Sequence, residues 1–433
     1  MERRAIEVRL ADAGFPPLPR LAWLEIDVDA LAGNLAAVRR LAGPGVRVEP
    51  VVKADAYGHG AVPVARRLED AGADGLCVAA VDEAIELRRG GVRLPILVLY
   101  PVPAAYVAAA AQARIAISTG GGRGLEQVLE AAAARAARGR RALVVHLEVD
   151  TGLGRGGVVG DDAATAAAAI RATRGVRLGG LWTHLQAAED PRRTGLQMKR
   201  FAAAADRLSA AGIPLPRRHV AASGMLLSGM VVAHDAVRPG LSIYGIVPEE
   251  LGPSPEDRAA AAGLRPVLSL HARPVRVVDL PSGSGIGYGP TFVTIRPSRI
   301  ATLPLGYGDG WSRALSNRAE ALVRGRRAPI VGNVSMDGIT VDVTDVPGRP
   351  VDEDDEFVLI GRQGAERISV LDVAQRRTTN TWEVVTAMAR RLPRVYHAAS
   401  EAVEVRSLAS GDRLWRALNS GTATSATWRS TRS

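Results

Sequence analysis

The feature that most constrains the fold is a regular alternation between short apolar runs and alanine-rich amphipathic stretches, from about residue 47 to residue 245. Eight runs can be counted, namely VEPVVKA, GLCVAA, PILVLY, ARIAIS, LVVHLEV, LGGLWTHL, HVAAS and AVRPGLSIYG. The stretches between them have apolar residues at helical spacing and tend to end at glycine. Strands that alternate with helices indicate a parallel sheet, and eight repeats predict a closed (β/α)8 TIM-type barrel. An open doubly wound sheet is the alternative fold.

The texture of the sequence changes after residue 265. Strand-like runs such as RIATLPLG and EFVLIG are separated there by Gly, Pro and Asp turns, which is typical of a mainly antiparallel all-β domain. The early run AWLEIDV precedes the eight barrel strands and is surplus to them. We therefore expect it to pair with the β domain.

These patterns predict four segments. Residues 1–46 form an N-terminal segment that packs in part with the β domain, and residues 47–262 form the barrel. Residues 263–407 form the C-terminal β domain. The segment 408–433 is rich in Ser, Thr and Ala without periodicity and is expected to be a disordered tail.

Composition and charge exclude several classes of function. The 433 residues carry a formal charge of +10, but the arginines are spread along the chain and aromatic residues make up only 4%, so we expect no nucleic-acid partner. The sequence has no apolar run near 18 residues, so we expect no membrane partner either. The N-terminus lacks the apolar block of a secretory signal, and a single cysteine allows no internal disulfide. Both features predict a cytoplasmic protein.

Lys53 stands out within the first apolar run. The chain has 55 basic residues, yet only Lys53 and Lys199 are lysines. A guanidinium keeps its proton in proteins, whereas an amine can lose it, attack a carbonyl and form a Schiff base. Lys53 is therefore a candidate nucleophile.

Other polar residues follow the predicted strands at the same end of the barrel. In such barrels the active site lies at the C-terminal ends of the strands. Six residues converge there: Lys53, Asp150, Arg155, His184, Ser223 and Arg238. An amine, two arginines and nearby backbone N–H groups suit a ligand with an aldehyde and a phosphate, and pyridoxal 5'-phosphate (PLP) has both. No cluster of His, Cys and carboxylates has the spacing of a zinc site, so no metal is expected.

Four motifs make the chain resemble the PLP-dependent alanine racemases, from about residue 20 to residue 407. They are VVKADAYGHG around Lys53, DTGLGRGG from Asp150, VRPGLSIYG from Val237, and the β-domain group GIGYGPTF, GYGDGWSR and VGNVSMDG. The resemblance implies interconversion of L- and D-alanine, which supplies D-alanine for peptidoglycan. It implies a homodimer with shared active sites and a small amino acid as substrate.

The resemblance also implies roles for individual residues. Lys53 would carry the cofactor and move the proton on one face of the substrate α-carbon, and Tyr288 of the partner subunit would act on the other face. Arg155 and the backbone at Met336 would hold the substrate carboxylate. The cofactor would be bound by Lys53, Tyr57, His184, Ser223, Arg238, Gly240, Leu241 and Trp382.

Three positions depart from the family pattern. Glu148 stands where many members carry a carbamylated lysine, and we expect its carboxylate to pair with Arg155. Ala222 replaces an asparagine before the phosphate-binding serine. Trp382 replaces a tyrosine, and its indole can donate a hydrogen bond but cannot accept one. These changes leave the tightness of cofactor binding and the restriction to alanine open.

Three alternative functions remain open on the sequence. The same chemistry could serve serine or a wider set of amino acids. A barrel-type PLP decarboxylase is a second alternative, although Tyr288 and the motif around Arg238 disfavour it. The third is a PLP-binding protein without catalytic activity, which would have no need for Tyr288.

Overall fold

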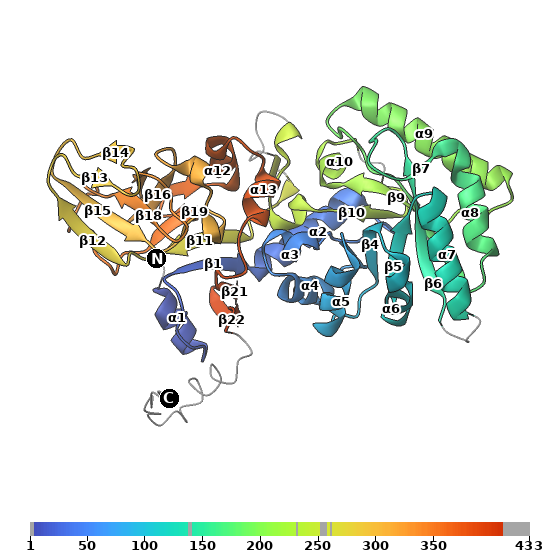
Figure 1. The fold of residues 1–433 in the computed structure, drawn as a ribbon, viewed down its shortest axis with the longest axis horizontal. Coiled ribbons are helices and arrows are strands. Elements are labelled where there is room, and N and C mark those ends of the chain that lie inside the picture. Colours follow the sequence, from blue (N-terminus) through green and yellow to red (C-terminus); the bar gives the residue numbers. More distant parts are fainter. Residues whose placement is uncertain (1–3, 137–140, 231–232, 252–257, 260–261, 410–433) are drawn as a thin grey trace, which may run out of the picture. The chain divides into compact units, whose positions relative to one another are not determined.

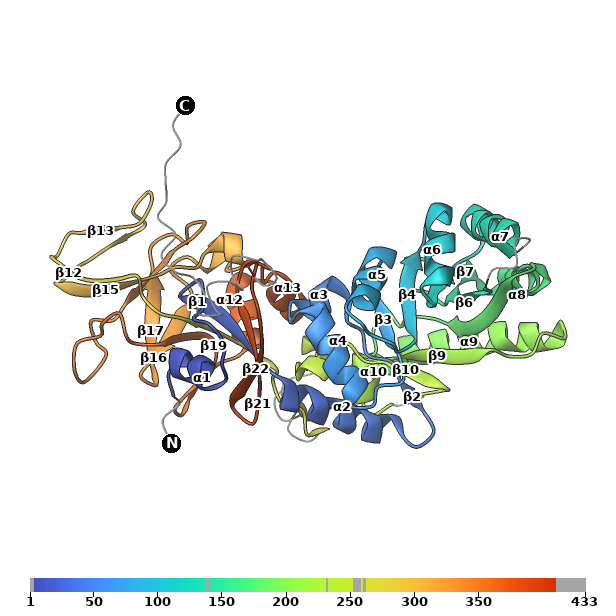
Figure 2. The same ribbon diagram turned by 90° about the horizontal axis from the view of Figure 1, so that it is seen from below.

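The structure is a computed structural model that describes residues 4–136, 141–230, 233–251, 258–259 and 262–409. The chain divides into two compact units (Figure 1, Figure 2). The barrel unit comprises residues 30–267, and the β unit combines the described residues up to Asp29 with those from Leu268 onward.

All eight predicted runs form strands of one parallel sheet. The strands are β2 (Arg47–Val48), β3 (Leu76–Val78), β4 (Ile96–Pro101), β5 (Ile115–Thr119), β6 (Leu143–Asp150), β8 (Val176–Trp182), β9 (Arg217–Ala222) and β10 (Ala236–Arg238). Their order is β2-β10-β9-β8-β6-β5-β4-β3. Hydrogen bonds of 2.8 Å from Val52 N–H to Cys77 O and from Cys77 N–H to Pro50 O join the two ends of this series. The sheet therefore curls into the predicted barrel, and the open doubly wound alternative is wrong.

Helices connect the barrel strands. They are α4 (Ala61–Asp70), α5 (Val81–Arg89), α6 (Val107–Gln112), α7 (Gly122–Ala136), α8 (Ala163–Ala172), α9 (Pro191–Ala210) and the short α10 (Ser223–Leu227). Helix α9 shows why these stretches are helical. The Asp190 carboxylate accepts hydrogen bonds from two N–H groups of the first turn, and Pro191 stands at the start, where its missing N–H costs nothing. Phe201, Ala204, Ala205 and Leu208 then form one buried stripe.

Helix α2 (Val28–Ala42) belongs almost wholly to the barrel unit. The Asn34 side chain donates hydrogen bonds to the carbonyls of Ile243 (3.0 Å) and Arg265 (2.8 Å), and Ala37 packs in an apolar cluster with Leu227 and other residues. The barrel unit thus starts at Ala30, whereas the sequence prediction starts the barrel at residue 47. Short-range patterns do not reveal such contacts between distant segments.

The β unit is built on a mainly antiparallel sheet in the order β12-β15-β18-β17-β16-β19-β11-β1-β21-β22. The strands are β1 (Ala22–Asp27), β11 (Leu268–Ala272), β12 (Arg276–Leu280), β15 (Ser298–Leu303), β16 (Glu320–Val323), β17 (Arg326–Val331), β18 (Ile339–Asp342), β19 (Phe357–Gln363), β21 (Arg394–Ala398) and β22 (Glu401–Arg406), with β20 (Glu366–Ile368) beside β19. Helices α1 (Ile6–Asp12), α12 (Val370–Arg377) and α13 (Thr381–Thr386) also belong to this unit, so it is not purely β.

The expected pairing of AWLEIDV with the β domain is confirmed, because β1 pairs antiparallel with β11 and parallel with β21. Trp23 and Glu25 of this strand are fully buried, and the Glu25 carboxylate accepts hydrogen bonds from the indole of Trp23 and the guanidinium of Arg9. A buried carboxylate is tolerated when it is paired in this way. The predicted tail, 408–433, lies outside the described residues except for its first two.

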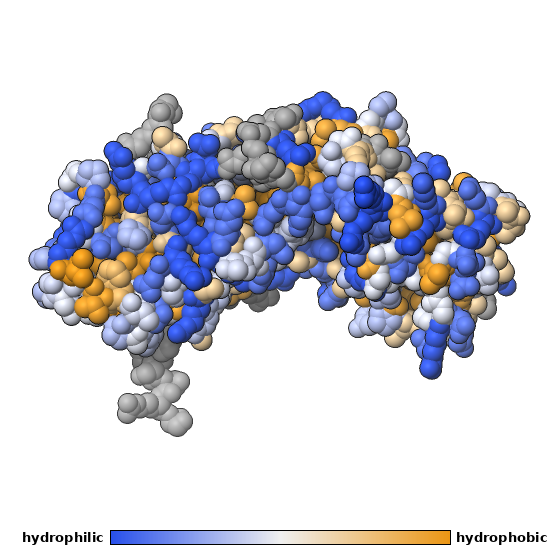
Figure 3. All heavy atoms as spheres, turned by 90° about the horizontal axis from the view of Figure 1, so that it is seen from above, coloured by the Kyte–Doolittle hydropathy of each residue, from blue (hydrophilic) through white to orange (hydrophobic). Residues whose placement is uncertain are grey.

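The surface is hydrophilic over much of the face shown in Figure 3, with small apolar areas between the charged side chains. In the part of the chain that the structure describes, no helix is both long and apolar enough to cross a bilayer.

Candidate active site

Lys53 lies at the C-terminal end of the first barrel strand, where it begins the short element α3 (Lys53–Tyr57). The four residues that follow it, Ala54 to Tyr57, have φ angles between 52° and 54°, so α3 is a left-handed turn. L-residues pay about 1–2 kcal/mol each for this conformation, or about 4–8 kcal/mol for the four. The surrounding structure must hold the turn in place.

Two carboxylates hold this turn. Asp55 accepts a hydrogen bond of 2.7 Å from Ala61 N–H, and Glu83 accepts one of 2.6 Å from Ala54 N–H. The second oxygen of Glu83 accepts from the N–H groups of Ala79 (2.8 Å) and Ala80 (3.0 Å). Glu83 therefore joins the segment next to Lys53 to the end of β3, a role that the sequence reasoning missed.

The environment of Lys53 favours its neutral amine. Burial lowers the pKa of Lys53, and the positive charge of Arg155 lowers it further, while Glu83 and Cys77 partly oppose this. A lowered pKa raises the fraction of the amine that can act as a nucleophile.

Tyr57, Ser223 and Gly240 come together beside the left-handed turn. Ser223 Oγ accepts hydrogen bonds from the N–H groups of Gly240 (2.8 Å) and Ser242 (3.2 Å). A Cβ on Gly240 would lie only 2.7 Å from Tyr57 Oη, so this backbone must be glycine to let the phenol approach. Burial raises the pKa of Tyr57, which keeps its hydroxyl protonated as a donor. The group of hydroxyls and N–H groups could bind a phosphate.

Arg238 ends β10 and is 2% exposed. Its guanidinium donates to His219 Nδ1 (2.6 Å), to the carbonyl of His219 (2.8 Å) and to the carbonyl of Thr183 (2.9 Å). It also lies over the ring of Trp182, 4.8 Å from the centroid. Arg238 is therefore held rigidly, as a group that faces a ligand must be.

Two buried histidines extend this network into the barrel. His219 Nδ1 accepts from Arg238, so the ring proton lies on Nε2 and is donated to His146 Nδ1 at 2.8 Å. Burial and the charge of Arg238 lower the pKa of His219 well below its ordinary value, and burial lowers the pKa of His146 to about 3. Both rings are neutral, which keeps the positive charge on Arg238.

His184 follows β8 at the same end of the barrel. Burial lowers its pKa to about 3, with further contributions from Arg238, Arg155 and Lys53. Since these three side chains act on the pKa of His184, the imidazole lies near them at the barrel mouth. Its imidazole is therefore neutral at physiological pH.

Arg155 lies in the loop after β6 and forms an ion pair with Glu148, with Nη2 and Oε1 3.8 Å apart. The predicted pairing is confirmed as a charge contact that is too long for a hydrogen bond. Burial raises the pKa of Glu148, while Arg155 and Arg238 oppose that rise. The Arg155 guanidinium also lies 5.5 Å from the ring centroid of Tyr100, a contact that the sequence reasoning missed.

Asp150 ends β6 at the barrel mouth and binds the loop that follows. One of its carboxylate oxygens accepts hydrogen bonds from the N–H groups of Gly152, Leu153 and Gly154, at 2.8 to 3.2 Å. Asp150 thus shapes the loop that presents Arg155. The predicted strand-end position of Asp150 is confirmed, because β6 ends at this residue.

Tyr288 belongs to the β unit, in the hairpin of β13 (Gly285–Ile286) and β14 (Phe292–Val293). Its side chain is 79% exposed, and within the described residues its hydroxyl has no hydrogen-bond partner. The Asn333 side chain donates to Tyr288 O at 2.8 Å and so holds the hairpin. The phenol is presented at the surface of its unit.

Met336 lies in a loop that Arg391 organises. Arg391 donates to both carboxylate oxygens of the fully buried Asp309 (2.7 and 3.0 Å) and to Asp337 (2.7 Å). The Met336 carbonyl accepts from Gly308 N–H at 2.9 Å. Asp337, whose role the sequence left undefined, is therefore a positioning residue for the loop that carries Met336. Arg391 itself was missed.

Two of the departures from the family pattern have clear positions. Ala222 ends β9 directly before Ser223, where a methyl group replaces a polar side chain. Trp382 is half-buried in α13. In the barrel unit the structure thus brings together two groups. The first is the nitrogen group of the Lys53 amine, the Arg155 and Arg238 guanidiniums and the neutral His184 imidazole. The second consists of the hydroxyls of Tyr57 and Ser223 with the backbone of Gly240 and Leu241. Tyr288, Met336 and Trp382 lie in the β unit.

Metal-ligand chemistry is not apparent in the described residues, where no three His, Cys, Asp or Glu side chains lie close enough together to hold an ion. The functional groups at the barrel mouth are an amine, guanidiniums, neutral imidazoles and hydroxyls.

Comparisons with known proteins agree with this arrangement. The family profile described as "Alanine racemase, N-terminal domain" matches residues 26–248, and "Alanine racemase, C-terminal domain" matches residues 267–396. The alanine racemase of Halothermothrix orenii is 39% identical over 88% of this chain and 97% of its own length. That of Symbiobacterium thermophilum is 41% identical over 87% and 97%.

Solved structures give the same result. The crystal structure of alanine racemase from Bacillus anthracis with bound L-Ala-P has a TM-score of 0.83 at 32% identity, covering 91% of this chain and 100% of that one. Alanine racemase from a D-cycloserine-producing Streptomyces lavendulae has a TM-score of 0.80 at 35% identity, covering 88% and 98%. The chain belongs to the alanine racemase family, in both its barrel and its β domain.

Proposed function

We propose that this chain is an alanine racemase that interconverts L- and D-alanine with PLP as cofactor and works as a homodimer. The observation that carries the proposal is the environment of Lys53. Its half-buried amine has a pKa lowered by burial and by Arg155, and it lies at the same end of the barrel as Arg238 and Ser223. The names of the relatives support alanine as the substrate.

The residues of the barrel mouth fit PLP at three points. Lys53 would bind the aldehyde carbon. Tyr57, Ser223 and the N–H groups of Gly240 and Leu241 would bind the phosphate, and Gly240 N–H would then be shared between Ser223 Oγ and the ligand. Arg238 would face the ring nitrogen. When bound, PLP withdraws electrons from the substrate α-carbon and makes its proton removable.

Arg238 would hold the ring nitrogen without protonating it. A guanidinium keeps its proton, and the neutral His219 and His146 behind it offer no alternative acid. This moderates the electron withdrawal and favours return of the proton to the same carbon over side reactions such as transamination.

Racemisation requires two proton carriers, because a single base tends to return the proton to the face that it left. Lys53 would serve one face of the α-carbon and Tyr288 the other. Tyr288 is 79% exposed on its own unit, as expected of a group that completes a site in a second copy of the chain. The homodimer is therefore part of the proposal.

Arg155 and the backbone at Met336 would hold the substrate carboxylate. Glu148 orients Arg155 by charge at 3.8 Å, and Asp150 shapes its loop. Trp382 would reach the phosphate only through its indole N–H. The supply of D-alanine to peptidoglycan follows from the activity, and a cytoplasmic location stays a prediction.

The test is incubation of the purified protein with PLP and each L-amino acid in deuterated buffer, followed by assays of chirality and α-deuterium. The proposal predicts that alanine gives both deuterium and D-product. Faster reaction of serine would favour the broader racemase, and carbon dioxide release without D-product would favour the decarboxylase. Absence of exchange with every amino acid would leave only a non-catalytic PLP-binding protein.

A further inference from the structure

A cavity of about 440 Å³ lies at the N-terminal end of the barrel. Its lining includes the first residues of three strands, Leu76 of β3, Ile96 of β4 and Ile115 of β5, together with Arg217, which begins β9. Because the strands are parallel, this end is opposite to the one that carries Lys53. The volume is in the range of pockets that take small organic molecules.

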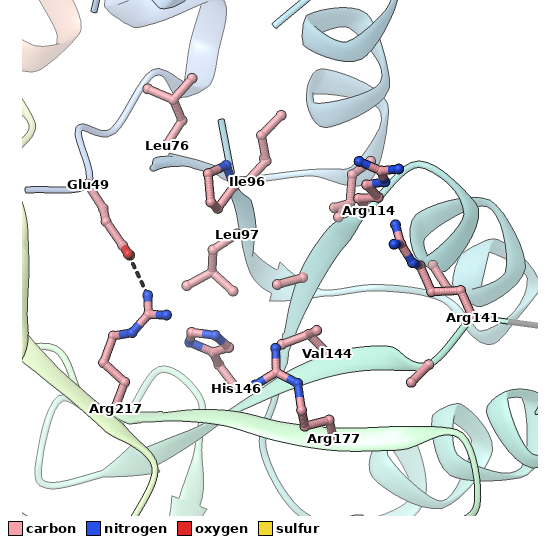
Figure 4. Close-up of a pocket in the computed structure, with 15 residues that line it drawn as sticks. Glu49, Leu76, Ile96, Leu97, Arg114, Arg141, Val144, His146, Arg177 and Arg217 are labelled. Atoms are coloured by element: carbon pink, nitrogen blue, oxygen red, sulfur yellow. Dashed lines mark hydrogen bonds and ion pairs between the residues drawn. The ribbon is translucent and has the colours of Figure 1, made fainter. Parts of the chain in front are cut away.

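The rim of the cavity is strongly basic. Arg114, Arg141, Arg177 and Arg217 line it with a single carboxylate, Glu49, so the lining carries a net charge of +3 while His146 is neutral. In Figure 4, Arg114 and Arg141 lie on one side, and His146 lies between Arg177 and Arg217. Guanidiniums that share one small cavity repel each other unless an anion joins them.

Glu49 does not neutralise this charge. Its carboxylate is 5% exposed and accepts from Arg217 at 2.6 Å and from Arg47, outside the cavity, at 3.1 Å. In the part of the chain that the structure describes, the guanidiniums of Arg114, Arg141 and Arg177 have no carboxylate partner. Three cationic donors thus face the cavity without a counter-charge.

The interior of the cavity is apolar. Leu97 and Val144 lie among its lining residues, and His146 closes it on the side of His219. His146 fits there because its neighbours on β8 are glycines: a Cβ on Gly180 would lie 2.3 Å from His146 Nδ1. A ligand would therefore meet an apolar surface with cationic groups at the rim.

We propose that this cavity is a binding site for a small organic anion that joins an apolar ring or branched body to two or three carboxylate or phosphate groups. The apolar body would lie against Leu97, Ile115 and Val144. The anionic groups would reach Arg114, Arg141 and Arg177, and Arg guanidiniums bind carboxylate and phosphate oxygens in pairs. The proposal does not depend on the reaction at the other end of the barrel.

The probe for the test is benzene-1,3,5-tricarboxylate, which has an apolar ring and three carboxylates. Its binding to the PLP-loaded protein is measured by isothermal titration calorimetry at low ionic strength, where charge interactions are screened least. We expect one tricarboxylate per chain, bound at least about tenfold more tightly than inorganic sulfate, because sulfate lacks the apolar body.

The decisive variant is Arg114→Gln with Arg177→Gln, and the matched control is Arg123→Gln with Arg171→Gln on helices α7 and α8. All four side chains are exposed, so both double variants should fold, and thermal melting checks this. If the first double variant does not fold, Arg177→Gln alone is tested in its place. The first pair should weaken tricarboxylate binding at least about tenfold and the control less than about twofold, while alanine racemisation without the probe stays unchanged in both.

Three results would overturn the proposal. They are absence of saturable binding, equal binding of sulfate and tricarboxylate, and equal weakening by the two double variants. The last result would mean that the probe responds to overall charge and not to the cavity.

Discussion

Replacing each of the two lysines of this chain by arginine distinguishes the effect of the positive charge from that of the reactive amine. Lys53→Arg and Lys199→Arg both keep the positive charge, but Lys199 is exposed on α9, away from any proposed role. At pH 8 a lysine with an ordinary pKa of about 10.4 is neutral in about one molecule in 250, and an arginine with a pKa of about 12.5 or more in at most about one in 30,000. Because burial and Arg155 lower the pKa of Lys53, the difference in the neutral fraction at this position exceeds about 100-fold.

The assay combines racemisation with chemical trapping. Each protein is loaded with PLP, reduced with borohydride, digested and analysed by mass spectrometry for a covalent adduct. Wild type and Lys199→Arg should carry the adduct at Lys53 and racemise alanine at equal rates within about twofold, whereas Lys53→Arg should carry none and lose at least about 1,000-fold in rate. An adduct at Lys199, or more than about 1% residual activity in Lys53→Arg, would refute the reasoning.

Three further predictions concern neighbouring groups. Glu148→Ala removes the charge beside Arg155 and should raise the KM for alanine about tenfold. The control Glu130→Ala, on the exposed face of α7, should leave the KM unchanged. An unchanged KM in Glu148→Ala would show that Glu148 does not orient Arg155. Gly240→Ala places a Cβ 2.7 Å from Tyr57 Oη and should weaken PLP binding at least about tenfold in a spectroscopic titration, whereas Gly195→Ala, which meets nothing within 4 Å, should not. His146 and His184 have pKa values lowered to about 3 in the folded protein, so below about pH 6.5 the unfolded chain binds more protons than the folded one. The stability that these histidines contribute is complete above pH 6.5 and is lost as the pH falls from 6.5 to 3, by about 1.4 kcal/mol per pH unit for each histidine. A melting temperature that is the same at pH 5.5 and pH 7.5 would contradict this.

The architecture could be predicted from the sequence because it rests on local periodicity. The eight apolar runs became eight strands, and the position of Lys53, His184, Ser223 and Arg238 at strand ends placed them at one mouth. The surplus run at 22–27 was assigned to the β unit by the same counting. Periodicity carries this information because strand and helix repeats differ.

The details of the site could not be predicted in this way. The left-handed turn at Ala54–Tyr57 has no glycine to signal it, and it is held by Glu83, which is distant in sequence. The contact of Arg391 with Asp309 and Asp337 likewise joins separate loops. Such contacts depend on tertiary geometry, which no short motif encodes. Asp150 lies at a strand end as predicted, but its hydrogen bonds to the loop N–H groups could not be predicted from that position.

The central claim is that one copy supplies Lys53 and the other supplies Tyr288 to each site. The most direct measurement mixes two inactive variants, Lys53→Arg and Tyr288→Phe, with subunit exchange allowed, and follows racemisation of alanine. If sites are shared, half of the dimers are mixed and each has one intact site, so about a quarter of the wild-type activity should return. If the mixture stays as inactive as its components while exchange is verified, the two groups do not meet across a dimer and the account is contradicted.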